Sequence, residues 1–227
     1  MTTVRSAINI TPFHDIPMQT PATVYVVDDD DELRASISRL LRSAGLTSRT
    51  FASADEFLDA ELDDMPACLL LDVRLPGTSG LELQERLNRL DIGLPIIIMT
   101  GHGDVQMSVK AMKAGAVDFL TKPFRDVTLL DAIDVALLRD RQRRERVQEI
   151  AELKKLHATL SPRESEVMLH VVVGKLNKQI ASDLAISEAT VKIHRAAIMR
   201  KMQATSLAEL VRMAMALDLQ PARSGEK

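Results

Sequence analysis

The sequence predicts an α/β domain built on a five-stranded parallel sheet, followed by a helical linker and a smaller all-α domain. Over residues 22–140, short β-rich runs alternate with amphipathic helical patterns, which is typical of parallel sheets covered on both faces. Beyond residue 140 only helical patterns occur. The charge also changes there, because residues 22–140 carry a net charge of −9 and residues 141–227 a net charge of +6. An acidic domain joined to a basic domain indicates two different partners.

The length and composition narrow the class of protein. The 227 residues suffice for one or two domains, at about 150 residues each. No apolar run approaches the ~20 residues of a membrane helix, so we expect no membrane association. Residues 1–21 lack the features of a secretory signal and are predicted to form a flexible tail. Cys68, the single cysteine, cannot form an internal disulfide, which favours a reducing cytoplasm.

Five β-rich runs, of which the second is weaker than the others, are predicted to be the strands of the sheet. They cover residues 24–27, 46–52, 67–73, 95–100 and 117–122. The helical pattern over 33–45 carries one apolar stripe and ends at a glycine, as helices commonly do. The segments that begin at Ser53 and Ser79 open with the spacing of a capping box. A further helix over 104–115 also ends at a glycine.

Polar side chains stand where these strands end. The residues are Asp28, Asp29, Asp72, Thr100 and Lys122. Each alone could have an ordinary role, such as a helix N-cap or a solvated charge. In a parallel sheet, however, ligands bind beyond the carboxyl ends of the strands, and these residues end several separate strands. We therefore expect them to form one site.

The chemistry of this set favours phosphoryl transfer. Clustered carboxylates repel one another unless a cation joins them, and oxygen ligands of this kind suit Mg²⁺. A carboxylate beside Mg²⁺ can attack phosphorus and form an acyl phosphate. Asp72 is the natural nucleophile, because its strand is central and no second carboxylate adjoins it. Asp28 and Asp29 are the natural metal ligands, while Thr100 and Lys122 could bind phosphoryl oxygens. The next two acidic residues, Asp30 and Asp31, suit the start of a helix.

The motifs VVDD, LLLDVRLPGTSG, MTGHGD and KAGAVDFLTKPF resemble the receiver domain of bacterial two-component response regulators over residues 22–140. The resemblance implies the strand order 2-1-3-4-5 and a sensor histidine kinase that phosphorylates Asp72. It implies that Asp28 and Asp29 form the acidic pocket, and that Mg²⁺ is held there mainly by Asp29, Asp72 and the main-chain carbonyl of Arg74.

The same resemblance assigns a switch. Thr100 and Lys122 contact the phosphate, the Lys122–Pro123 peptide is cis, and Phe119 turns inward as Thr100 moves towards the phosphate. The segment from residue 101 to 124 is similar to the FixJ branch of the family in particular. In that branch the phosphorylated receiver forms a homodimer, and Val109 and Lys113 hold matching positions on the dimerising face.

The linker over residues 141–157 is predicted to be helical and continuous with the helix that begins near Val127. No Pro or Gly interrupts it, and apolar residues recur at helical spacing. Pairing with a second copy in a dimer and a simple solvated helix remain open as alternatives.

Four helices are predicted in the second domain, over residues 158–221, with a C-terminal tail over 222–227. Ser161, Pro162 and Glu164 have the pattern of a capped helix start. Two later helices joined by a tight turn are the core of a helix-turn-helix. In the longer one, Val191, Ile198 and Met202 form the predicted core stripe, flanked by two basic side chains. The opposite face holds Lys192, Ile193, Ala196, Met199 and Arg200.

The motifs LSPRESEV and NKQIASDLAISEATVKIHRAAIMRKM resemble the LuxR-type four-helix DNA-binding domain. By that resemblance, Lys192, Ile193 and Ala196 face base edges. The residues expected near the phosphate backbone are Lys178, Thr190, His194, Arg195 and Arg200. Some members of the family carry a basic residue at the position of Ala196, so base readout there would be steric.

Together these features predict a transcription regulator that binds promoter DNA and is not an enzyme; RNA polymerase would be a further partner if it is an activator. A haloacid-type phosphatase is a competitor, but such enzymes usually need an acid where this chain has Arg74. A quorum-sensing LuxR-type regulator lacks the predicted polar rim. A receiver that no longer accepts phosphate is the third alternative, although every expected residue is present.

Overall fold

The computed structural model describes residues 21–101 and 105–219, so the predicted N-terminal tail lies almost wholly, and the C-terminal tail wholly, outside the described residues. Two compact units divide between Gln142 and Arg143, and each is described by itself. The predicted domain limits at residues 140, 157 and 221 remain predictions. Among the described helices, none is long and apolar enough to cross a membrane.

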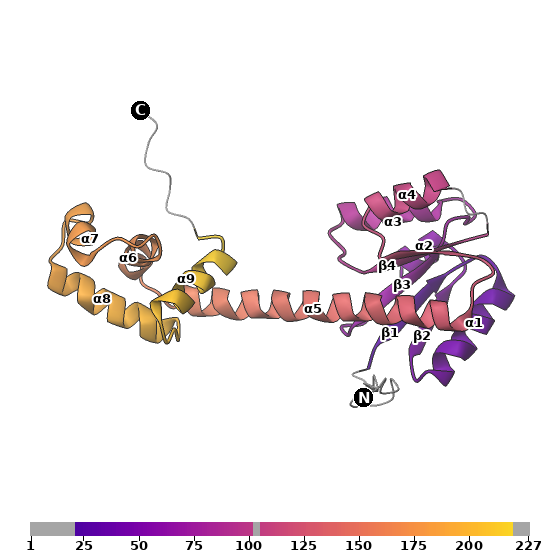
Figure 1. The fold of residues 1–227 in the computed structure, drawn as a ribbon, viewed down its shortest axis with the longest axis horizontal. Helices are drawn as coiled ribbons and strands as arrows, with labels where there is room; N and C mark the ends of the chain where they lie inside the picture. The colour runs from indigo at the N-terminus through magenta and orange to yellow at the C-terminus, as the bar shows by residue number, and fades with distance from the viewer. Residues whose placement is uncertain (1–20, 102–104, 220–227) are drawn as a thin grey trace, which may run out of the picture. The chain divides into compact units, whose positions relative to one another are not determined.

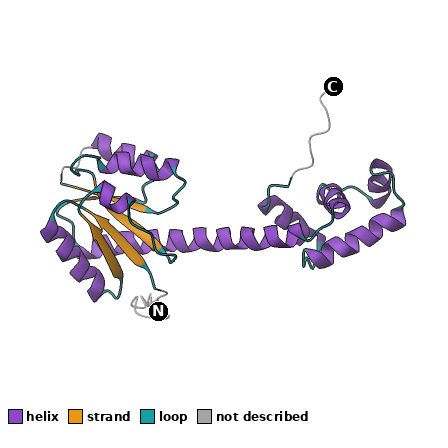
Figure 2. Ribbon diagram, turned by 180° about the vertical axis from the view of Figure 1, so that it is seen from behind, coloured by secondary structure: helices purple, strands orange, loops and turns teal. Residues whose placement is uncertain are grey.

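The first unit contains a five-stranded parallel sheet in the order β2-β1-β3-β4-β5, which confirms the predicted fold (Figures 1 and 2). The strands are β1 Thr23–Val27, β2 Thr47–Phe51, β3 Ala67–Asp72, β4 Ile96–Thr100 and β5 Asp118–Thr121. Strands β1, β3 and β4 are buried along their whole length. Their register pairs Val27 with Leu71, and Asp72 with Met99, so the ends of neighbouring strands lie at one edge.

Helices cover both faces of this sheet. They are α1 Asp31–Ser43, α2 Ala54–Leu58, α3 Gly80–Arg89, α4 Val105–Lys113 and α5 Asp126–Ala158. Helices α2, α3 and α4 lie on one face and pack on a core that includes Phe57 and Leu83 (Figure 1). Helices α1 and α5 cover the other face, around Leu41 and Ile133. The sheet is thus covered on both faces, as the alternation of strands and helices predicts.

The helix starts follow the predicted capping patterns, with one difference. Asp30 is the N-cap of α1 and accepts hydrogen bonds from the N–H groups of Glu32 and Leu33, and Asp31 is the first helical residue. Ser79 and Glu82 form a complete capping box at α3. At α2, Ser53 caps the helix, but the Glu56 carboxylate accepts its bond from Ala52 N–H, at 2.7 Å, and not from Ser53.

Helix α5 is continuous over 33 residues, so the predicted linker is the second half of that helix. Within the first unit, Asp140 is fully buried and its carboxylate accepts a hydrogen bond from Ala67 N–H at 2.9 Å. This bond ties α5 to the start of β3. Towards the other end of α5, Leu156 packs against the core of the second unit.

The second unit is all-α, as predicted. After the end of α5 it contains α6 Pro162–Val172, α7 Asn177–Asp183, α8 Glu188–Lys201 and α9 Leu207–Ala216. Ser161 and Glu164 form a complete capping box at α6, with Pro162 in its first turn. A core around Val167, Ile180 and Ile198 holds the four helices together.

Candidate functional site

The predicted polar residues meet at the carboxyl edge of the sheet. Asp28 follows β1 and is buried, whereas its neighbour Asp29 is exposed. Asp72 and Thr100 are the last residues of β3 and β4 and are also buried. Lys122 comes directly after β5, which ends one residue earlier than predicted. Because neighbouring strands end in register, residues up to 94 positions apart in the chain come into contact here.

An ammonium group joins two of the carboxylates. Lys122 Nζ lies 2.6 Å from Asp28 Oδ2 and 2.8 Å from Asp72 Oδ2. Carboxylate oxygens of Asp28, Asp29 and Asp72 all lie within 4.8 Å of one another. Two of these three acids share one lysine and the third, Asp29, lies beside them, which leaves an excess of negative charge that a cation would neutralise. An oxygen-only donor set of this kind fits Mg²⁺.

Burial and hydrogen bonding act in opposite directions on the pKa values of Asp28 and Lys122. Burial raises the pKa of Asp28 above its usual value, although its hydrogen bond with Lys122 acts in the other direction. For Lys122, burial alone would lower the pKa, but the hydrogen bonds to Asp28 and Asp72 outweigh burial and raise it. Lys122 is therefore a permanent positive charge at neutral pH, suited to bind a phosphoryl oxygen.

The loop after β3 holds the Asp72 side chain in place. Asp72 Oδ1 accepts a hydrogen bond from Arg74 N–H at 3.2 Å, and Gly80 N–H donates to the Val73 carbonyl at 3.0 Å. Gly80 packs so closely that a Cβ there would lie 2.0 Å from the Asp72 carbonyl oxygen. From the sequence, Gly80 was predicted only as part of a capped helix start, because nothing local in the chain reveals this approach.

We expect Gly80→Ala to destabilise the protein by about 1–3 kcal/mol, because the new methyl group must displace backbone at Asp72. Urea unfolding followed by circular dichroism measures the change. Gly101→Ala is the matched control, since a Cβ at Gly101 meets nothing within 4 Å. Equal unfolding midpoints for the two variants would contradict the steric effect.

The residues predicted to act as the switch lie beside this site. Thr100 is fully buried at the end of β4, and Phe119 on β5 is half-buried against the core under α2, α3 and α4. The Lys122–Pro123 peptide is cis, as the resemblance implies. Arg74 has an exposed side chain, and its main-chain carbonyl as a metal ligand stays a prediction.

Helix α4 presents the two residues predicted for dimerisation. Val109 is 45% exposed and Lys113 is also exposed, so both are accessible. Met112 adds a second exposed apolar side chain to the helix. The last turn of α4 is held from α3, where Asn88 Nδ2 donates to the Ala114 carbonyl at 2.8 Å and Gln84 Nε2 to the Ala111 carbonyl at 3.1 Å.

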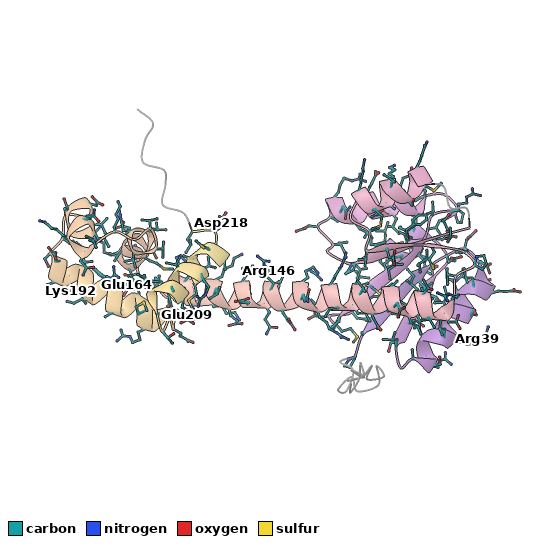
Figure 3. All side chains as sticks on the ribbon, viewed as in Figure 1. Arg39, Arg146, Glu164, Lys192, Glu209 and Asp218 are labelled. Atoms are coloured by element: carbon teal, nitrogen blue, oxygen red, sulfur yellow. The ribbon has the colours of Figure 1, made fainter. Side chains whose placement is uncertain are left out.

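A second candidate site is the outer face of α8, where Figure 3 labels Lys192. Lys192, Ala196 and Arg200 are exposed, and Ile193 is 68% exposed although it is apolar. Thr190, His194 and Arg195 are half-buried along the sides of the helix, while Lys178 is exposed on α7. An exposed face with basic and apolar side chains suits the major groove of DNA.

One residue of this face was placed wrongly by the helical projection. Met199 is half-buried and packs against the core of the unit with Ile198, instead of facing outward. The projection took the core contact as one narrow stripe, but Met199 also lines a small cavity together with Leu207 and Leu210 of α9.

The site also includes a residue that the sequence did not reveal. Arg34, on α1, donates from Nη1 to the Asp28 carbonyl at 2.5 Å, and it pairs with Asp31. It therefore supports the main chain of the acidic pocket from outside. Its spacing of six residues from Asp28 was the only available signal, and an arginine six residues after an aspartate is too common a pattern to predict this contact.

Each of the two units matches a known protein family. Residues 24–134 match the response regulator receiver domain, and residues 158–214 match the family described as bacterial regulatory proteins, luxR family. Nodulation protein W of Bradyrhizobium diazoefficiens is 54% identical over 200 residues, which cover 88% of each chain. Response regulator protein TodT of Pseudomonas putida is 48% identical over 192 residues, covering 85% of each chain.

Three further likenesses extend over most of the chain. Transcriptional regulatory protein FixJ of Rhizobium meliloti is 44% identical over 197 residues, covering 87% of this chain and 97% of that protein. The solved structure of response regulator StyR is 46% identical and superposes with a TM-score of 0.75, over 86% of this chain and 98% of that one. Full-length FixJ from B. japonicum is 43% identical with a TM-score of 0.54, over 89% and 100% of the two chains.

These matches decide between the functional classes. They pair a receiver with a DNA-binding domain in one chain, which neither a phosphatase nor a quorum-sensing regulator does, and a receiver implies a histidine kinase as partner. The chain belongs to the two-component response regulators of the FixJ/NarL type, and it is a phosphorylation-regulated transcription regulator, not an enzyme.

Proposed function

We propose that a partner histidine kinase phosphorylates Asp72, and that this event controls promoter binding by α8 in the cytoplasm. The observation that carries the proposal is the contact of Lys122 with both Asp28 and Asp72, at 2.6 and 2.8 Å. In the reaction, a carboxylate oxygen of Asp72 attacks the phosphorus, and the histidine nitrogen of the kinase leaves. Lys122 is already placed to bind an oxygen of the transferred group.

Mg²⁺ is the cofactor that we propose for this step. Asp28, Asp29 and Asp72 would hold it, together with the main-chain carbonyl of Arg74. The support is the set of carboxylate oxygens within 4.8 Å of one another, of which only those of Asp28 and Asp72 pair with Lys122. When bound, Mg²⁺ would neutralise negative charge on the acids and on the phosphoryl oxygens.

The signal then passes from Asp72 to the surface of α4. We assign the Thr100 hydroxyl to the phosphate and Phe119 to the inward movement that follows. Thr100 lies on β4, next to β3, and Phe119 lies on β5, the strand beyond it. Phe119 packs against the core beneath α4. The changed surface, which includes Val109 and Lys113, pairs with a second copy of the chain.

Pairing brings two copies of α8 to the DNA. Lys192, Ile193 and Ala196 read base edges, and Lys178, Thr190, His194, Arg195 and Arg200 contact the backbone. The exposure of Ile193 supports this role, because a large apolar side chain on the surface indicates a contact partner such as a thymine methyl group. A dimer would bind two half-sites about one helical turn apart, and as an activator it would contact RNA polymerase.

The experiment compares the full-length protein with and without acetyl phosphate in the presence of Mg²⁺. Light scattering measures the oligomeric state, and binding is measured to a site that the wild-type protein selects from random-sequence DNA. We expect acetyl phosphate to increase both the dimer fraction and the affinity for the selected site. A phosphorylated protein that stays monomeric and binds no more tightly would refute the proposal.

Replacing Lys192 with alanine should weaken binding to the selected site by about 1–3 kcal/mol if the ammonium contacts a base edge. Sequence preference should relax at the contacted position, which titration of single-base variants of the site reveals. Lys155→Ala, on the exposed surface of α5, is the control for a simple loss of charge. Equal losses for both variants would show that Lys192 acts only through its charge.

A further inference from the structure

The first turn of α6 contacts the segment that leads into α8. Arg163, the second residue of α6, donates a hydrogen bond from Nη2 to the Leu184 carbonyl. Leu184 is the C-cap of α7 and belongs to the tight turn before α8, whose N-cap is Ser187. The guanidinium is kept in place by Glu166, whose carboxylate lies 2.6 Å from Arg163 Nη1.

The same turn of α6 also contacts the far end of α8. Glu164 is 7% exposed, and its Oε2 accepts a hydrogen bond from Lys201 Nζ at 2.6 Å. Lys201 is the last residue of α8. The same oxygen accepts from Ser161 N–H at 2.7 Å and so completes the capping box. The Lys201 ammonium and the cap lower the pKa of Glu164, which keeps the carboxylate charged at neutral pH.

Two directional contacts therefore hold α8, one before its first residue and one at its last. The helix has 14 residues, a length of about 21 Å. Between the two contacts, α8 is held by buried apolar side chains such as Val191 and Ile198. Apolar burial is non-directional and tolerates small rotations, whereas hydrogen bonds to charged groups need a defined geometry.

We propose that Arg163, Glu164 and Lys201 are positioning residues for DNA recognition: they fix the rotation and height of α8, without reading bases themselves. The inference rests on the proposed reading of DNA by α8 and adds the residues that aim it. Readout of base edges requires side chains at hydrogen-bond distance, so a small shift of α8 should cost sequence-specific affinity far more than non-specific affinity.

The test measures the ratio of affinities for the selected site and for a scrambled fragment, using the full-length phosphorylated protein. In Glu164→Gln the amide oxygen can still accept the bond from Ser161, so the cap is kept and the charge is lost. We expect this variant, and Lys201→Met, to lower the ratio about five- to tenfold. For Glu164→Gln, a lower affinity for the selected site cannot come from the lost charge, because removal of a negative charge should by itself strengthen binding to any DNA.

Three controls separate positioning from a general loss of structure. Lys201→Arg should keep most of the wild-type affinity ratio, because the guanidinium can reach the same carboxylate. The double variant Glu164→Gln with Lys201→Met should lose no more than either single variant, since the two act through one contact. Glu152→Gln, which removes the same charge from an exposed pair on α5, should leave the ratio unchanged.

The outcomes distinguish this inference from the proposed function. If Lys192→Ala lowers the ratio while Glu164→Gln and Lys201→Met stay within twofold of wild type, α8 reads DNA but the α6 contacts do not aim it. If Lys192→Ala leaves the ratio unchanged, the reading by α8 is itself wrong. Thermal unfolding identifies any variant that fails to fold. The Lys201 side chain is half-exposed, so a lowered affinity ratio in Lys201→Met at unchanged stability supports a positioning role.

Discussion

Asp72→Asn is expected to abolish phosphorylation of the protein by acetyl phosphate in the presence of Mg²⁺. An amide oxygen is not a nucleophile that can form an acyl phosphate, so the substitution removes the reacting group while it keeps the side-chain size. We expect wild-type protein to gain acid-stable, base-labile phosphate, and the variant to gain none. Mass spectrometry of the intact protein detects the addition.

The fold should survive this substitution. Asp72 is one of three crowded carboxylates, and loss of one negative charge relieves their repulsion. The ammonium keeps Asp28 as its partner at 2.6 Å. A suitable control is Asp91→Asn, because Asp91 lies in a left-handed turn with φ 54°, a conformation that asparagine also accepts. Phosphate on the Asp72→Asn variant at the wild-type level would show that another residue is the acceptor.

Asp29→Asn is expected to reduce the affinity for Mg²⁺ by at least about tenfold, which corresponds to about 1.4 kcal/mol. Asp28 and Asp72 are both held by Lys122, whereas no ion pair of Asp29 occurs among the residues that the structure describes. Its exposed carboxylate is therefore the one most free to bind a cation from solvent. Isothermal titration calorimetry measures the affinity directly.

The matched control lies two residues further along the chain. Asp31 is in the first turn of α1, where it pairs with Arg34 and favours the positive end of the helix dipole. Asp31→Asn removes the same charge close to the pocket, but it removes no ligand. We expect unchanged Mg²⁺ affinity and a small loss of stability. If both variants weaken Mg²⁺ binding equally, the effect is long-range electrostatics and Asp29 is not a ligand.

Much of this protein follows from local patterns in its sequence. The alternation of strand and helix, the two complete capping boxes at Ser79 and Ser161, and the run Asp28–Asp31 that divides between a pocket and a helix start could all be read residue by residue. They are readable because strand period, helix period and capping each depend on neighbours within a few positions. The polar rim was also predictable, since parallel strands bring their carboxyl ends to one edge.

Tertiary packing decided what depends on residues far apart in the chain. Three contacts join separate elements. Lys122 pairs with both Asp28 and Asp72, Gly80 packs closely on the Asp72 carbonyl, and Glu164 of α6 accepts a hydrogen bond from Lys201 of α8. Met199 packs inward for the same reason, because the core of the second unit and the cavity it lines with Leu207 and Leu210 of α9 are formed by several helices, which a single-helix projection does not include. The sequence by itself determined the order of the elements and which residues end each strand of the sheet. Only the packing of one element against another determined the distances between side chains and the inward position of Met199, since these depend on side-chain volumes and contacts that no local period encodes.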